Sequence, residues 1–520
     1  HELFLQASLP EPPKFSDSLA VGLYSWMQKA AEQSGLIEDL CSAFEEEEVF
    51  LILDLCAYML SRESAVMQHF PAWAREHVLF SDNILNDTYL GQFLKHNLTV
   101  SKIGLFMEQW ARRNLGDGRV YLCYDSTNVN SQAEGVFIVQ KGHAKDNPNL
   151  GQVNTDYVVR QSDGLPLTYL HSPGSVTDIA QAQEMIAFAN ELKVKSDHEV
   201  ELCMVCDRGY ISEKNLRHMD KAGINYILML RTSFGLYEQL AEDAIDSIKS
   251  YKNELRTNSE TELYGITRSC TFYEGGPECH AQILWSAERY TVKRREISAN
   301  LAAERLKLEQ FIKQHQGKSL PAEDLAWIPA YFKLITHPGI PLITEKKQRG
   351  RGQSTVKIDT PTFLVTGYED DEQAINKLYQ KAGIVILITR KSLTAQETED
   401  AYSKRDCVEK VFRALKSHLG MDKIGVTTEE AMHGKGLLWF VASILHALLF
   451  NGTASLRTAD KKHYTVPAMI DQLEAIKADK NLSSSKRHRR YKLTQRQQKI
   501  LAQWHINEQK IDKMIADLED

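Results

Sequence analysis

The sequence predicts an α/β protein whose core is interrupted by a β-rich insertion and flanked by helical N-terminal and C-terminal regions. Apolar residues recur at helical spacing through the first 115 residues. From Arg119 to residue 231, short β-rich runs alternate with helical runs, which is typical of a mixed sheet covered by helices. Residues 232–383 break this alternation with irregular β-like runs and one strongly charged helix.

Length and composition exclude several classes of protein. The chain has 520 residues, of which 43% are hydrophobic and 25% charged, so it is neither mainly disordered nor fibrous. Lys and Arg total 62 against 69 Asp and Glu, and the net charge of −7 restricts any nucleic-acid contact to local basic patches. No run reaches the ~18 apolar residues of a membrane span, and we expect no secretory signal. The eight sparse cysteines indicate a reducing cytosol.

We therefore expect five segments along the chain. They are a helical N-terminal domain (1–115), the first part of the core (116–231), the β-rich insertion (232–383), the second part of the core (384–450) and a helical, basic C-terminal region (451–520).

Individual elements follow from the periodicity within these segments. Ser16 and Asp17 are expected to cap the first helix. In the first part of the core we expect a three-strand meander from the runs 119–127, 135–142 and 157–170, then a helix at 176–193, a strand ending before Asp207, a helix at 212–222 and a strand at 225–230. After the insertion we expect a strand at 383–389, one long helix at 395–418 and an apolar core helix at 436–450.

Three acids lie at positions expected to be buried or half-buried, where a carboxylate is unfavourable unless it has a partner or a function. Asp125 projects from one face of the first strand, and Asp207 closes the apolar strand "VELCMVC", where an open α/β sheet presents its ligands. Glu409 lies on the long helix. For each aspartate alone, a turn or cap role is the competing interpretation.

The long helix carries a second stripe beside its apolar one. At about 100° per residue, Tyr402, Arg405, Glu409 and Lys416 fall within about 60° of arc. An ion-paired surface face would explain this pattern, but a carboxylate flanked by cations also suits a phosphodiester, because the acid can hold a metal while the cations hold phosphate oxygens.

Two basic runs are candidate contacts for a polyanion. The first lies among glycines in a loop and contains Lys346, Lys347, Arg349 and Arg351. The second contains Lys486, Arg487, Arg489 and Arg490 with no acid between them. A solvated surface is the alternative for both runs. His433 and Lys435, which open the apolar helix, are weaker candidates for which a surface turn competes.

These motifs match a known pattern. The chain resembles the DDE transposases of bacterial insertion sequences in the IS-four superfamily, whose third acid lies in a Tyr-x2-Arg-x3-Glu-x6-Lys signature; "YSKRDCVEKVFRALK" matches it through Tyr402, Arg405, Glu409 and Lys416. The first-acid motif resembles "YDSTNVN" and the second "VCDRGYISEKNL". "GHAKDNPNLGQVN" and "DGLPLTYLHSPGSVTD" resemble the stretch between these acids in the subgroup with a β-rich insertion, and the resemblance spans about residues 119 to 450.

The resemblance implies a fold and a chemistry. It implies a ribonuclease-H-like core in which Asp125, Asp207 and Glu409 bind two Mg²⁺ ions, with Mn²⁺ as a substitute, for in-line phosphoryl transfer. Water would first nick double-stranded DNA at the terminal inverted repeats, and the freed 3′-hydroxyl would then attack target DNA. Arg405 and Lys416 would clamp phosphates, and Tyr402 would orient a phosphate or stack on a base.

The resemblance also implies partners. Coordinated cleavage at two ends implies a homodimer in the active complex, with the N-terminal domain or the basic C-terminal run reading the ends, in the bacterial cytosol at the nucleoid. Two alternatives stay open: a domesticated DNA-binding protein that does not mobilise DNA, and a two-metal nuclease that cuts without strand transfer.

Overall fold

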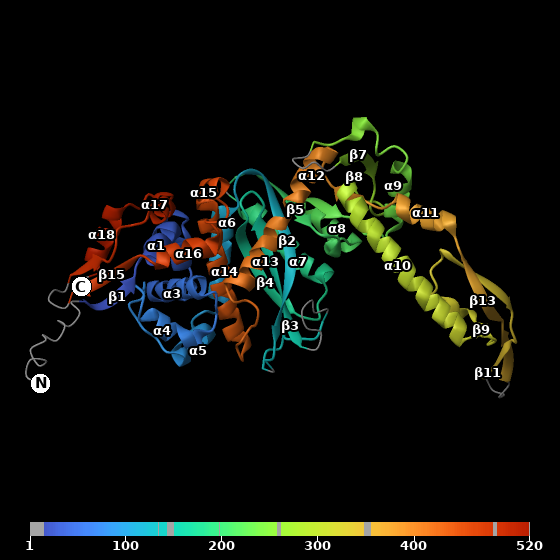
Figure 1. Ribbon diagram of the computed structural model, residues 1–520, viewed down its shortest axis with the longest axis horizontal. Coiled ribbons are helices and arrows are strands. Elements are labelled where there is room, and N and C mark those ends of the chain that lie inside the picture. The colour runs from blue at the N-terminus through green and yellow to red at the C-terminus, as the bar shows by residue number, and fades with distance from the viewer. Residues whose placement is uncertain are drawn as a thin grey trace, which may run out of the picture. The chain divides into compact units, whose positions relative to one another are not determined.

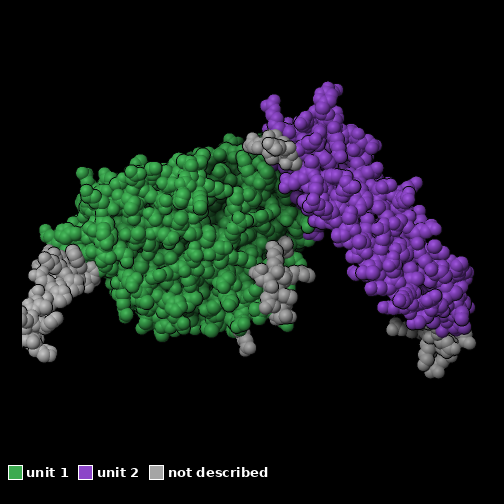
Figure 2. All heavy atoms as spheres, viewed as in Figure 1, with its two compact units in different colours: residues 1–228, 400–520 green, residues 229–399 purple. Residues whose placement is uncertain are grey.

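The computed structural model describes residues 15–133, 135–142, 150–196, 198–256, 262–347, 355–481 and 486–518. The chain forms two compact units (Figure 2). Unit 1 contains residues 1–228 and 400–520, and unit 2 contains residues 229–399. The β-rich segment expected at 232–383 therefore lies inside unit 2, and the chain returns from unit 2 to complete unit 1.

The core of unit 1 is a mixed sheet whose strands lie in the order β4-β3-β2-β5-β6. Its strands are β2 (Gly118–Ser131), β3 (Gly151–Arg160), β4 (Leu165–Pro173), β5 (Val200–Cys206) and β6 (Asn225–Met229). β3 is antiparallel to β2 and β4, whereas β2, β5 and β6 are parallel. The predicted mixed α/β architecture is confirmed.

The meander exists, but the predicted strand at 135–142 is wrong. Within that run only Gln140 forms an isolated bridge, to Gln152. The reason is that β3 pairs with β2 from Leu122 to Ser131 and occupies that edge of β2. Val136 and Ile138 are buried in a turn instead, so their hydrophobicity reflects burial rather than strand pairing.

Helices cover this sheet (Figure 1). They are α6 (Val100–Asn114), α7 (Asp178–Lys195), α8 (Glu213–Ala222), α13 (Asp406–His418), α14 (Glu429–Gly452) and the short 3₁₀ helix η3 (Arg208–Tyr210). The expected helices at 176–193 and 212–222 are confirmed by α7 and α8. Ser212 caps α8 by accepting from the backbone N–H of Asn215, and Gly223 ends it at a φ of 63°.

The predicted single helix from Ala395 to His418 is wrong, because it is broken into α12 (Ala395–Ser403) and α13. At the break, the backbone N–H of Arg405 donates to Tyr402 O at 3.0 Å and that of Val408 donates to Arg405 O at 3.3 Å. These i→i−3 bonds are of the 3₁₀ type and tighten the turn. Tyr402 and Arg405 therefore do not share one regular helical face with Glu409.

Helix α14 is the central core helix of unit 1. By length and composition it could cross a membrane, but 78% of its most apolar window is buried inside the protein. Lys435, which opens this apolar stretch, is buried and donates to Ile424 O at 2.7 Å. Burial lowers its pKa to about 8. Lys435 therefore lies neither in a surface turn nor on a DNA-facing surface.

The two ends of the chain meet in one structure, which we call the terminal region (residues 15–96 and 454–518). Its elements are β1 (Phe15–Ala20), α1 (Gly22–Gln33), α2 (Leu36–Cys41), α3 (Glu46–Arg62), η2 (Met67–His69), α4 (Phe70–Ala74), α5 (Asp87–His96), α15 (Ala454–Ala459), α16 (Val466–Glu474), β15 (Lys477–Asn481), β16 (Arg487–Arg489), α17 (Gln495–Ala502) and α18 (Glu508–Asp517). β1 pairs with β15, and β15 pairs with β16, all antiparallel (Figure 1).

One prediction for these ends is wrong, because Ser16 and Asp17 lie in strand β1 rather than at a helix cap. The C-terminal region is largely helical, as predicted, but it also contains β15, and Arg487–Arg489 of its basic run form β16. The pairing of β1 with β15 joins segments more than four hundred residues apart. Close packing fixes where α1 begins: a Cβ on Gly22 would lie 2.3 Å from Leu473 O of α16.

Unit 2 combines short sheets with one long helix. Its elements are α9 (Gly235–Ala244), η4 (Tyr251–Asn253), β7 (Leu263–Cys270), β8 (Cys279–Ser286), α10 (Ala287–Gln314), β9 (Leu320–Pro321), η5 (Ala322–Leu325), β10 (Phe332–Pro338), β11 (Leu342–Lys347), β12 (Thr355–Thr360), β13 (Thr362–Asp370), α11 (Glu372–Gln380), β14 (Ile384–Thr389) and the start of α12. Leu301 and Leu308 of α10 pack with Phe332 of β10 in a small hydrophobic cluster.

Candidate active site

The register of the sheet brings the first two acids together. β2 and β5 are parallel neighbours, and Tyr124 of β2 pairs with Cys206 of β5. Asp125 and Asp207 each follow this pair by one residue, so they lie side by side where β5 ends. Ligands commonly bind at the carboxyl ends of parallel strands because the chain leaves the sheet there.

Asp125 is held by donors on one oxygen and faces a cation with the other. Its Oδ1 accepts from the backbone N–H of Ser126 at 2.9 Å and from the hydroxyl of Tyr210 at 3.3 Å. Its Oδ2 lies 3.4 Å from a terminal nitrogen of Arg405. The side chain is 20% exposed, so the carboxylate is accessible at one end and fixed at the other.

Asp207 occupies the turn after β5 and caps η3, where its Oδ1 accepts from the backbone N–H of Arg208 at 2.7 Å. It is half-buried. A carboxylate at a helix start is stabilised by the unpaired N–H groups there, which explains locally why an acid ends this strand.

Glu409 completes the group from the first turn of α13. One of its oxygens lies 2.7 Å from the Arg405 guanidinium, and its side chain is 51% exposed. Arg405 stands at the N-cap position of α13 and has only 14% of its side chain exposed. We call Asp125, Asp207, Glu409 and Arg405 the acid cluster.

The electrostatics of Arg405 connect all members of the acid cluster. Burial lowers the pKa of its guanidinium. Interactions with Tyr402 and with the three acids raise this pKa by more, so it lies above its ordinary value. The three acids predicted from sequence therefore all interact electrostatically with one half-buried cation.

Tyr402 and Lys416 flank the acid cluster differently from the helical-wheel prediction. Tyr402 lies in the last turn of α12, is buried, and places its ring centroid 5.8 Å from the Arg405 guanidinium carbon. Lys416 lies on α13, about two turns beyond Glu409 and on the same side of the helix, and is half-buried. Because Tyr402 is buried, its ring is better placed to support Arg405 than to stack on a DNA base.

The donor set of the acid cluster suits a divalent ion. Carboxylate oxygens are the ligands that Mg²⁺ prefers, and here three carboxylates already share one cation. In the part of the chain that the structure describes, no group of three His, Cys, Asp or Glu side chains is spaced to hold a metal ion. At the acid cluster the Arg405 guanidinium lies between Asp125 and Glu409 and occupies the position between their carboxylates.

The two basic runs have different outcomes. Lys346 and Lys347 end strand β11 rather than lying in a loop, and Arg349 and Arg351 fall outside the described residues. DNA contact by this run stays a prediction.

In the second run, two of the four predicted DNA-binding cations pair with acids of the terminal region. Arg489 pairs with Glu508 at 3.0 Å and with Asp512 at 3.1 Å, whereas Arg490 pairs with Asp479 at 2.7 Å. Lys486 is exposed and Arg487 half-buried, and their DNA contact stays a prediction.

Tyr210 is a site residue that the sequence analysis missed. It lies three residues after Asp207 and reaches back to Asp125. The signal was present in "CDRGY", because a tyrosine one short turn after a strand-ending acid can point at the neighbouring strand, but the spacing alone does not say which strand that is.

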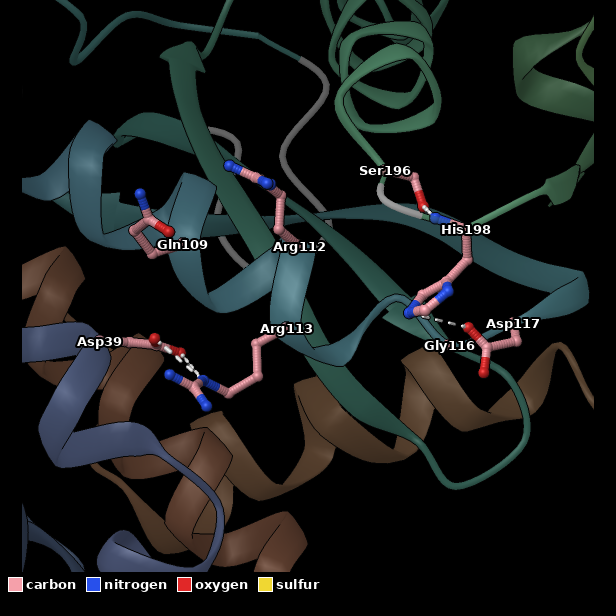
Figure 3. A pocket seen from close by; sticks show the side chains of 8 residues that line it. All are labelled: Asp39, Gln109, Arg112, Arg113, Gly116, Asp117, Ser196 and His198. Atoms are coloured by element: carbon pink, nitrogen blue, oxygen red, sulfur yellow. Dashed lines mark hydrogen bonds and ion pairs between the residues drawn. The ribbon is translucent and has the colours of Figure 1, made fainter.

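A pocket lies at the amino ends of β2 and β5, at the other end of these strands from the acid cluster (Figure 3). It encloses about 410 Å³ and is lined by Asp39, Gln109, Arg112, Arg113, Gly116, Asp117, Ser196 and His198. Within it Arg113 pairs with Asp39 at 2.9 Å, and His198 lies 3.7 Å from Asp117. Because acids offset its cations, the pocket has no pronounced preference for an anion.

Carboxylates gathered at the end of a mixed sheet are compatible with metal-dependent phosphoryl transfer, because they offer the oxygen ligands that divalent ions prefer. The sequence model described as "Transposase DDE domain" matches residues 117–445, more than half of the chain, and the chain belongs to this family. The family is one of DNA-cleaving and strand-transferring enzymes that generally use divalent metal ions.

Curated proteins and solved structures were the other two groups compared with this chain. Among curated proteins, none matches the sequence. Among solved structures, the chain is similar to a piggyBac transposase in a synaptic complex with hairpin DNA, at 8% identity and a TM-score of 0.38, over 91% of this chain and 72% of that one. At this TM-score the likeness carries no argument.

Proposed function

We propose that the protein is the DNA transposase of a bacterial insertion sequence, of the IS-four superfamily type, which cuts double-stranded DNA at the element ends and joins them to target DNA. The observation that carries the proposal is the acid cluster: Asp125, Asp207 and Glu409 surround one half-buried arginine inside the segment matched by the transposase family. A ribonuclease-H-like identity of the core is part of the proposal.

The three carboxylates would hold the metal. Asp125 offers Oδ2 and Glu409 offers the oxygen that now contacts Arg405, while Asp207 contributes from the turn after β5. Two bound Mg²⁺ ions, or Mn²⁺ in their place, would supply activation of the attacking oxygen and stabilisation of the leaving 3′ oxygen.

The cations of the site would handle the phosphates. Arg405 is fully charged and carries a planar fork that fits either a carboxylate or a phosphate bidentately. When DNA enters, we expect its guanidinium to exchange a carboxylate for a phosphate oxygen beside the scissile bond. Lys416, farther along α13, would contact a phosphate as a point charge, and Tyr402 would hold Arg405 in place.

The wider assembly follows from the chemistry. Cutting two element ends in a coordinated way requires two active sites, so we propose a homodimer in the active complex. Water would be the first nucleophile and the freed 3′-hydroxyl the second, at the same acids. Reading of the ends by residues 1–115 or by Lys486 and Arg487, in the bacterial cytosol at the nucleoid, belongs to the same proposal.

The test uses the purified full chain with labelled DNA that spans the native element end, in Mg²⁺ or Ca²⁺. We expect nicking at the end in Mg²⁺ only, and a loss of at least about 1,000-fold in Glu409→Gln, because the substitution removes a charged metal ligand. Asp406→Asn is the matched control: it removes an acid from the same turn of α13, where Asp406 forms only an exposed pair with Lys410.

Each alternative has its own outcome in this test. Joining of the cut ends to a second DNA would support the transposase and exclude a plain nuclease. Nicking without joining would favour the nuclease. Binding of the end without any cut by the wild-type chain would overturn the proposal in favour of a domesticated DNA-binding protein.

A further inference from the structure

Tyr210 belongs structurally to the segment of the second acid. It ends η3, and its backbone N–H donates to the carbonyl oxygen of Asp207 at 3.1 Å. Only 3% of the residue is exposed, so it offers no surface to DNA. Any movement of the Asp207 turn therefore moves Tyr210 with it.

The hydroxyl of Tyr210 nevertheless reaches the first acid. It donates to Asp125 Oδ1 at 3.3 Å and contacts the hydroxyl of Ser126 at 3.0 Å. A hydrogen bond to an ionised carboxylate is stronger than one between neutral groups. This one residue thus connects the two aspartate-bearing segments through a side chain.

The ring of Tyr210 is fixed by a second buried tyrosine. The ring centroids of Tyr210 and Tyr124 lie 4.7 Å apart at an angle of 53°. Tyr124 in turn donates from its hydroxyl to Oδ1 of Asp156, which is fully buried on β3. Through Tyr124, the sheet therefore restrains the ring of Tyr210, and the Tyr210 hydroxyl has little freedom to move away from Asp125.

This arrangement decides how Asp125 presents its oxygens. The backbone N–H of Ser126 and the Tyr210 hydroxyl both donate to Oδ1, so rotation about χ2 would break both bonds. Oδ2 then faces Arg405 and the other acids of the cluster. Hydrogen bonds to ligating carboxylates of this kind orient them, and their loss typically weakens metal binding.

We propose that Tyr210 is a positioning residue that locks the Asp125 carboxylate relative to Asp207, so that both acids present an oxygen to the same divalent ion. The inference rests on the proposed function, because it takes the acid cluster as the metal site. Tyr210 acts through Asp125 and touches neither the DNA nor the ion.

The test compares Tyr210→Phe with Tyr124→Phe in the full chain without DNA. Both substitutions remove one hydroxyl from the same pair of contacting rings, but only the first removes a bond to Asp125. Mn²⁺ is titrated and its free ion followed by electron paramagnetic resonance, with Asp125→Asn defining the binding that depends on the acid cluster.

We expect Tyr210→Phe to weaken Mn²⁺ binding by about tenfold or more and Tyr124→Phe by less than about twofold. In nicking assays Tyr210→Phe should require a correspondingly higher Mg²⁺ concentration, with end binding in EDTA unchanged. Equal Mn²⁺ affinity of Tyr210→Phe and wild type, or equal losses in the two variants, would overturn the inference. So would wild-type binding no tighter than that of Asp125→Asn.

The two proposals fail in different ways. If the wild-type chain binds Mn²⁺ through Asp125 and loses it in Tyr210→Phe but never cuts the element end, the positioning role is supported and the transposase proposal fails. If the wild-type chain cuts and joins DNA while Tyr210→Phe binds Mn²⁺ normally, the transposase proposal is supported and the positioning role fails.

Discussion

Two regions of unit 1 each place an arginine between two carboxylates. In the acid cluster, Arg405 lies between Asp125 and Glu409 with 14% of its side chain exposed. In the terminal region, Arg489 lies between Glu508 and Asp512 with 12% exposed. By residue type, distance and burial the two arrangements are almost alike.

They differ in where the acids come from. Glu508 and Asp512 are one turn apart on α18, so either acid alone would keep Arg489 and β16 against that helix. Asp125 and Glu409 come from a strand and a helix that the chain joins only after passing through unit 2, and Asp207 adds a third charge. Like charges repel in both regions. In the acid cluster, however, Arg405 joins separate elements of the core, whereas Arg489 attaches one short strand to one helix.

The largest expected difference between the two arginines is in activity. Arg405→Ala should lower the rate of end nicking by at least about 100-fold, because a phosphate contact inside the site is lost. Arg489→Ala should leave that rate within about threefold. Single-turnover nicking at saturating chain concentration measures both, and equal losses in the two variants would show that the comparison fails.

A buried carboxylate without an arginine sharpens the comparison. Asp54 of α3 is 1% exposed and accepts from the backbone N–H groups of Phe80 and Ser81 and from the Ser81 hydroxyl. Burial nonetheless raises its pKa to about 7. Its hydrogen bonds resemble those of Asp125, but among the described residues no cation forms an ion pair with it.

The pH dependence of stability should reveal this difference. The folded pKa of Asp54 lies above its ordinary value, so its contribution is fully present below about pH 3.8 and is lost as the pH rises through about 7. From pH 5 to pH 8, wild type should therefore lose about 3 kcal/mol of unfolding free energy relative to Asp54→Asn.

Urea titrations at both pH values measure this effect. Asp82→Asn is the matched control, since it removes an exposed neighbouring charge and should keep most of the pH dependence. Parallel wild-type and Asp54→Asn curves would show that the hydrogen bonds of Asp54 already keep it ionised.

The smallest effect is expected for the stability contribution of Arg489. Arg489→Ala should lower the free energy of unfolding by about 1 kcal/mol, because its acids are partly exposed and water replaces much of the interaction. Lys486→Ala removes the same charge from an exposed position of the same run and should cost less than about 0.5 kcal/mol. Urea unfolding compares them, and an equal cost would deny Arg489 a structural role.

Much of the candidate site could be proposed from local sequence. Asp207 ends an apolar strand and Glu409 opens a helix with its own apolar stripe, and both features depend on residues within one or two turns. The alternation of strands and helices in the core was equally visible, since periodicity reports burial along a single element.

Other features depend on contacts that the local sequence does not carry. The break between Tyr402 and Arg405 is not marked by proline or glycine, and the loss of a strand at 135–142 depends on β3 having taken that edge of β2. The basic run at 486–490 looks like a nucleic-acid contact until Glu508 and Asp479 are seen beside it.

By itself, the sequence determined the class of fold and the choice of three candidate acids, because strand and helix periods and the motifs around Asp125, Asp207 and Glu409 are properties of short segments. Only the tertiary structure decided which strands are neighbours, that Arg405 lies among these acids, and that Tyr210 ties Asp125 to the turn of Asp207. The physical reason is range: hydrophobic patterning acts along one element, whereas hydrogen bonds and ion pairs depend on which elements meet.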